Sequence, residues 1–176
     1  FVQSDSHPQG YTTNCHGNFL NVDTLGQQRN NNDLNGANWE GGGLIRVTAE
    51  NIALHGDIRA RGYLGSAGGG IGLTLTGGTV TGAGTLDAGV QWSGNPDSRY
   101  LAGGSRISVI GYSSISDDVI ENARVNGAAH YSAPGTVFYR EAGQQFGNLV
   151  VRAIGSVPRA TTPIELGDTT RFLKVR

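Results

Sequence analysis

Residues 68–76 read Gly-Gly-Gly-Ile-Gly-Leu-Thr-Leu-Thr, a glycine cluster followed by apolar residues at alternate positions. A period of two is typical of a half-buried β-strand, because successive side chains point to opposite faces. Glycines also precede an alternating stretch at 41–48 and at 103–109. The recurrence predicts a repeated β unit.

A shift of 28 residues aligns the first two units without a gap. It places Ile45 on Leu73, and five further pairs match: Val47 with Leu75, Ile52 with Val80, Gly56 with Gly84, Ile58 with Leu86 and Ala60 with Ala88. Further units begin near residues 103, 134 and 163. Since one unit cannot bury its inward face alone, we expect the units to stack and to pair with their neighbours rather than within themselves.

The stacking predicts an all-β fold, a β-solenoid of about four to five coils in which Ile45, Leu73 and Ile107 lie above one another. A β-sandwich is the alternative, because it also has short strands and frequent turns. Residues 117–124 are a possible helix, although a bent strand explains them equally well. Residues 1–40 are polar and without a clear period, which predicts an irregular cap or the end of a preceding coil, and residues 41–176 form the repeats.

Composition excludes several classes of function. Only 15% of the residues are charged and 37% are hydrophobic, so the chain is too apolar to be disordered. The 13 basic and 14 acidic residues give a net charge of −1, which offers no general attraction to nucleic acid or an anionic membrane. No apolar run approaches the length of about 18 residues that a membrane helix needs.

The cysteine and the histidines give no sign of a metal or cofactor site. Cys15 is the single cysteine, which excludes an intrachain disulfide, and we interpret it as a free or buried thiol rather than a nucleophile activated by His16. The other histidines, His7, His55 and His130, do not pair at the spacings that metal ligands show.

Asp117 and Asp118 form the one adjacent pair of carboxylates, the residue type that performs acid–base work in polysaccharide hydrolases. Neighbouring strand residues point to opposite faces, so a solvated turn is the preferred interpretation. Trp92 and Tyr100 flank an insertion at 93–99, and insertions into a solenoid often map to a binding face. These aromatic rings are candidates for stacking on glycans or partner surfaces, or for covering the coil below them.

Three stretches resemble the glycine-rich repeats of large secreted bacterial proteins of the adhesin-like, or filamentous-haemagglutinin-like, type: residues 67–75 with 80–88, residues 102–109, and residues 133–140 with 147–151. The resemblance covers roughly residues 41–155. It implies a right-handed parallel β-helix, an extracellular multi-domain context and no active site.

We therefore expect a non-enzymatic structural or adhesin segment, secreted or at the cell surface, that serves as a scaffold for attachment or assembly. The alternatives are a self-assembling subunit of an extracellular filament or sheath, and a β-helical polysaccharide lyase or hydrolase. The expected partners are neighbouring domains of a longer chain, further copies of the chain and glycans.

The two ends of the chain prompt one further expectation. The chain starts at Phe1 and contains no methionine, which is typical of a mature product or a piece of a longer protein. Residues 172–176 alternate like a strand and lack a polar cap. Because exposed strand edges invite pairing, we expect this end to abut a following domain or another copy.

Overall fold

The computed structural model of the chain describes residues 20, 22–26, 40–63, 66–91, 104–127 and 134–152, together with the backbone of 172–175. This part of the protein is mostly β-structure with one short helix, and most of its strands pair in parallel. The expected all-β composition is therefore correct apart from that helix.

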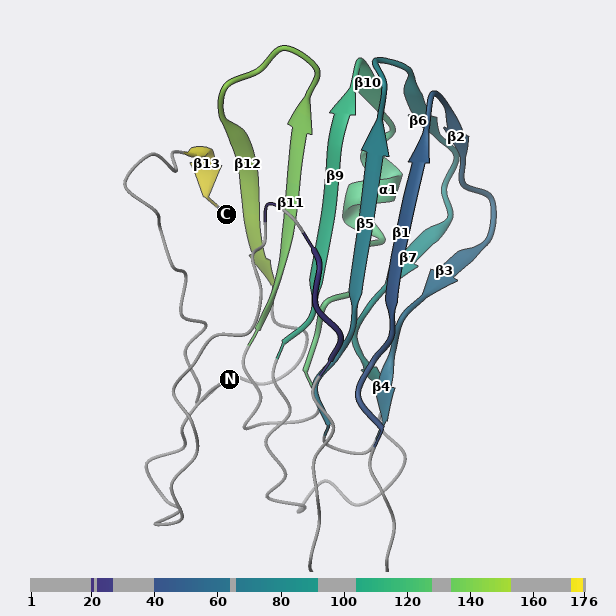
Figure 1. The fold of residues 1–176 in the computed structure, drawn as a ribbon. Coiled ribbons are helices and arrows are strands. Elements are labelled where there is room, and N and C mark those ends of the chain that lie inside the picture. The colour runs from purple at the N-terminus through teal and green to yellow at the C-terminus, as the bar shows by residue number, and fades with distance from the viewer. Residues whose placement is uncertain are drawn as a thin grey trace, which may run out of the picture.

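The elements follow one another in three layers and a hairpin (Figure 1). The first layer consists of β1 (Leu44–Ala49), β2 (Ile52–Ala53), β3 (Asp57–Arg59) and β4 (Gly62–Tyr63). The second repeats this order with β5 (Gly70–Leu75), β6 (Thr79–Thr81), β7 (Thr85–Asp87) and β8 (Val90–Gln91). The third contains β9 (Arg106–Tyr112), β10 (Ser114–Ile115) and α1 (Asp117–Glu121). The described chain continues with β11 (Gly135–Glu141), β12 (Gly147–Arg152) and β13 (Phe172–Val175).

Equivalent strands of successive layers lie side by side and run in the same direction. The largest sheet has the order β1-β5-β9-β11-β12-β13, and its first four strands pair in parallel. Three smaller parallel sheets, β10-β6-β2, β3-β7 and β4-β8, repeat the arrangement along the rest of each layer. Parallel pairing between units favours solenoid-like layers over a β-sandwich, whose sheets are antiparallel.

The core lies inside the layers and is filled by alternate residues of the large sheet and by residues of the smaller ones. Leu73 of β5 is 1% exposed and belongs to one core cluster with Val80 of β6, Leu86 of β7, Val109 of β9 and Val119 of α1. Full burial of such a side chain stabilises the fold by about 1.5–3 kcal/mol. The alternation seen in the sequence therefore marks the inward face correctly.

The expected ladder of Ile45, Leu73 and Ile107 is wrong by two residues in the large sheet. Ile45 pairs with Ile71, which in turn pairs with Ile107, while Leu73 lies between Val47 and Val109. A slip of two residues leaves the same face inward, so these residues still point to the core. The shift of 28 is correct for the smaller sheets: Ile52 pairs with Val80, and Ile58 pairs with Leu86.

The turn after β5 explains why the shift changes from 26 to 28. Ala49 pairs with Leu75, and the next partners are Ile52 and Val80, so the first layer advances three residues (52 − 49) where the second advances five (80 − 75). Gly77 lies in the longer turn with φ +98°, a conformation that other residues rarely adopt. An alignment without a gap cannot place these two extra residues.

The fourth unit departs from the expected pattern. β11 pairs in parallel with β9 as predicted, but β12 returns antiparallel to β11. The expectation that strands pair only between units is therefore wrong here. A short connection at 142–146 forms a hairpin, because antiparallel neighbours can be joined by a few residues whereas a parallel strand needs a long crossover.

Residues 20 and 22–26, called the strap below, lie across the outer face of the large sheet. Val22 is 2% exposed and packs over Gly70, which alternates with the inward-facing Ile71. Figure 1 shows the strap as a purple trace crossing the strands. The rest of 1–39 lies outside the described residues, so the division into 1–40 and 41–176 stays a prediction.

Leu73→Ala should lower the free energy of unfolding by about 2–5 kcal/mol, because the substitution removes a fully buried side chain. Leu25→Ala is the matched control: Leu25 is 63% exposed, and its loss should change stability by no more than about 0.5 kcal/mol. Urea unfolding followed by circular dichroism measures both. Equal losses in the two variants would contradict the assignment of the core.

Candidate functional site

A row of charged residues crosses the outer surface of β3 and β7, and we call it the arginine–aspartate face. It consists of Asp57, Arg59, Arg61, Asp87 and Arg124. The strand register aligns Arg59 of the first layer with Asp87 of the second, and Asp87 with Arg124 of the third. Positions that stack in successive layers therefore carry charges of alternating sign.

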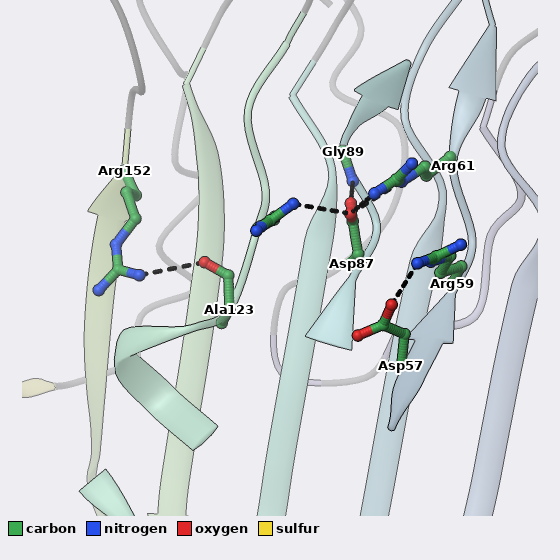
Figure 2. A network of polar contacts seen from close by, with 8 residues as sticks. Asp57, Arg59, Arg61, Asp87, Gly89, Ala123 and Arg152 are labelled. Carbon is green, nitrogen blue, oxygen red and sulfur yellow. Dashed lines mark hydrogen bonds and ion pairs between the residues drawn. The ribbon is translucent and has the colours of Figure 1, made fainter. Parts of the chain in front are cut away.

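Asp87 is the centre of this face, and its side chain is only 4% exposed. Arg61 donates to Asp87 Oδ2 through Nε at 2.8 Å and also through Nη2, while Arg124 Nη1 lies 4.0 Å from the same oxygen. The backbone N–H of Gly89 donates to Oδ1 at 3.2 Å. Figure 2 shows Asp87, Arg61 and Gly89 converging in this way. Both carboxylate oxygens thus have partners, which a buried charge requires.

These contacts shift the pKa values of two side chains in the arginine–aspartate face. The hydrogen bond to Asp87 raises the pKa of the Arg61 guanidinium above its usual value. The hydrogen bond from Arg59 lowers the pKa of the Asp57 carboxyl. The Asp57–Arg59 pair is exposed, so water screens it and it contributes little to stability.

Outside the arginine–aspartate face, Arg152 connects the hairpin of β11 and β12 to helix α1. Arg152 of β12 donates through Nη1 to the backbone oxygens of Ile120, Glu121 and Ala123 at 3.3, 2.7 and 3.0 Å, and its Nη2 lies 3.6 Å from Glu121 Oε2. Figure 2 shows the contact with Ala123. The carbonyl end of a helix favours a cation, and α1 has no basic residue of its own in its last turn. Arg152 therefore anchors α1 beside the core.

The arginine–aspartate face offers two exposed cations. The side chains of Arg59 and Arg124 are 57% and 55% exposed, and three arginines against two aspartates leave the face with one excess positive charge (3 − 2). Planar guanidinium groups match the geometry of carboxylate and phosphate groups. The arrangement can therefore hold its own layers together and contact an anionic group.

The sequence prediction missed this face, although a signal was present. The alignment that placed Ile58 on Leu86 also places Arg59 on Asp87, which are opposite charges at stacked positions. Asp87 pairs in turn with Arg124 of the third layer, but these residues are 37 apart in the sequence (124 − 87), so an alignment with a shift of 28 does not find this partner.

The predicted site residues fall in two groups. Asp117 and Asp118 are exposed in the first turn of α1, where carboxylates are favoured by the helix dipole. The expected solvated turn is thus a helical turn. Trp92 and Tyr100 lie outside the described residues, as does Cys15. Binding at any of these residues stays a prediction.

The described ranges give no metal centre: no three His, Cys, Asp or Glu side chains gather closely enough there to hold an ion. His55 is exposed just before β3, and the other histidines are outside those ranges. The helix found in the described chain is too short to cross a bilayer.

Comparison with known proteins finds no matching family model, no matching curated protein and no matching solved structure.

Arg61→Met should lower the free energy of unfolding by about 1–3 kcal/mol, because it leaves the buried Asp87 carboxylate without its closest partner. Arg59→Met removes the same kind of side chain from an exposed pair that water screens, so it should lower stability much less than Arg61→Met does. Denaturant unfolding of both variants, of Asp87→Asn and of Arg61→Met/Asp87→Asn provides the test. The double variant should lose less than the sum of the single losses, and strict additivity would contradict the coupling.

Proposed function

We propose that the chain is a non-enzymatic structural segment of a secreted or surface-attached protein, a right-handed parallel β-helix of about four to five coils. In this role it is a scaffold for surface attachment or for assembly with neighbouring domains, further copies or glycans. The observation that carries the proposal is that aliphatic side chains fill the space inside the layers. Ile71, Leu86 and Ile107, from three strands of two successive layers, are all fully buried.

The surface chemistry supports the same proposal. Asp117 and Asp118 are consecutive helical residues, and side chains at adjacent helical positions do not face each other across a substrate. Glycoside hydrolysis needs two carboxyl groups on opposite sides of the scissile bond. Glu121, the nearest other acid in the sequence, makes an ion pair with Arg152. The arrangement of Asp117, Asp118 and Glu121 therefore favours a structural surface over a catalytic site.

Incubation of the purified chain with acidic and neutral polysaccharides should release no new reducing ends or unsaturated products. Asp117→Asn/Asp118→Asn should behave identically, since neither aspartate performs chemistry in a scaffold. Heat-unfolded wild-type chain serves as the blank. Reproducible cleavage that disappears in the double variant would overturn the proposal in favour of a lyase or hydrolase.

A second candidate, a self-assembling filament subunit, is favoured by the edges of the large sheet. Within the described strands, β1 and β13 are the outermost members of the sheet and each pairs on one side. The inward residues Ile45, Val47, Ile52 and Ile58 of the first layer are only partly buried. Open edges of this kind can be continued by the edge of another chain.

Light scattering over a range of concentrations distinguishes the two candidates. A filament subunit should show an average mass that increases with concentration without reaching a limit, because end-to-end contacts do not close. A scaffold segment should reach a constant mass. Constant mass equal to one 18.4 kDa chain at every concentration would exclude the filament.

A further inference from the structure

The strap covers part of the outer face of the large sheet, and the surface beneath it is called the groove below. Gly70 and Gly72 of β5 form the floor of the groove beneath Val22. A Cβ atom at Gly70 would lie 2.3 Å from Val22 Cγ1, closer than atoms can approach. The notch that receives Val22 therefore exists because Gly70 has no side chain.

A second apolar surface extends the groove toward the hairpin. Phe138 of β11 and Leu149 of β12 are buried partners on this face, and Leu20, Ile110 and Val151 pack against them. The groove thus receives two apolar side chains of the strap, Leu20 and Val22, separated by one residue. This spacing is that of an extended segment, whose alternate side chains share one face.

Polar contacts fix the direction of the strap. Arg106 Nη2 donates to Thr24 Oγ1 at 2.7 Å, and Ser108 Oγ donates to the backbone oxygen of Leu20 at 3.2 Å. Arg106 and Ser108 are paired with Gly70 and Gly72 in the sheet, so all four belong to the same surface. The groove therefore recognises both the apolar side chains of the strap and the direction in which its backbone runs.

The strap is not a strand of any described sheet. Its backbone is joined to the first layer at one end, where Gly26 N–H donates to the backbone oxygen of Gly42 at 2.8 Å. Release of Leu20, Val22 and Thr24 would consequently leave every strand pair of the layers intact. Segments held in this way open at lower cost than paired strands.

From this geometry we infer that the groove is also a self-recognition site, which takes the strap of a second copy of the chain in exchange for its own. Each copy presents the same strap, so the exchanged contacts are identical to those lost and the groove is refilled rather than exposed. Residues 20–25 reach at most about 20 Å, so two exchanging copies lie with their outer faces together. This contact is distinct from pairing at β1 or β13 and does not depend on the scaffold function.

A disulfide can report which chain's strap occupies the groove. A Cβ at Gly72 would lie 3.8 Å from Val22 Cβ, which is the usual separation in a disulfide, and it would meet no closer atom. All variants carry Cys15→Ser, so that the natural thiol takes no part. Val22→Cys/Gly72→Cys in one chain should close within that chain on oxidation at low concentration, which verifies that the strap still seats in the variant.

The decisive sample mixes full-length chains that carry Val22→Cys alone with size-tagged chains that carry Gly72→Cys alone. Exchange should produce a covalent heterodimer on a non-reducing gel, because the two thiols meet only between copies. Leu25→Cys mixed with Gly72→Cys is the matched control: Leu25 is an exposed strap residue, and its thiol should give at least tenfold less heterodimer. Equal yields from both mixtures, or no heterodimer although the double variant closes, would overturn the inference.

A native-mass measurement gives an independent readout. The wild-type chain should show a concentration-dependent dimer, the oxidised double variant should stay monomeric, and a reductant should restore the dimer. A dimer that survives the internal disulfide would overturn strap exchange and indicate contacts at the sheet edges instead. The scaffold proposal is unaffected by either result, because its own test is the polysaccharide assay.

Discussion

The described fold depends on backbone pairing between equivalent strands of successive layers. Buried N–H and C=O groups must have partners, and in parallel strands those partners belong to another layer. This pairing places Ile71 between Ile45 and Ile107 on the inside. The same requirement brings Arg59, Asp87 and Arg124 together on the outside. Core and surface site thus follow from a single register.

Parallel sheets are usually covered on both faces, and this protein meets that requirement in two different ways. The inner face is covered by the smaller sheets and by α1, while the outer face receives the strap and carries the cluster around Phe138. The residue types differ accordingly. The inner face of β5 has large aliphatic side chains, whereas its outer face has glycine at positions 70 and 72, where another segment lies against it.

The alternation of apolar residues was sufficient to predict the strands, the inward face and the stacking of units, because a period of two is a direct result of strand geometry. The register in the large sheet was not predictable from a gapless alignment, since Gly77 and its neighbours add two residues to one turn. The seating of Val22 depends on contacts between distant segments, for which local sequence carries no period. The reversal at β12 occurs at a short connection that contains Gly143 at φ +76°, and an alignment of whole units does not test for such a hairpin. The stacked charges of Arg59 and Asp87 add nothing to an apolar period, so a repeat defined by apolar residues does not reveal them.

The hairpin of β11 and β12 also affects the order in which the chain acquires its structure. Between β1 and β5, partners are 26 residues apart, and between β5 and β9 they are 36 apart, whereas Tyr139 and Asn148 are separated by nine. Closing a short loop costs less entropy and is faster than closing a long one. The hairpin is thus the described pair best suited to form first and to serve as a template for β9. Folding that starts at the hairpin proceeds from the carboxyl side of the chain toward β1. Because synthesis runs in the opposite direction, the ribosome completes the three layers before the hairpin that nucleates their folding has been made.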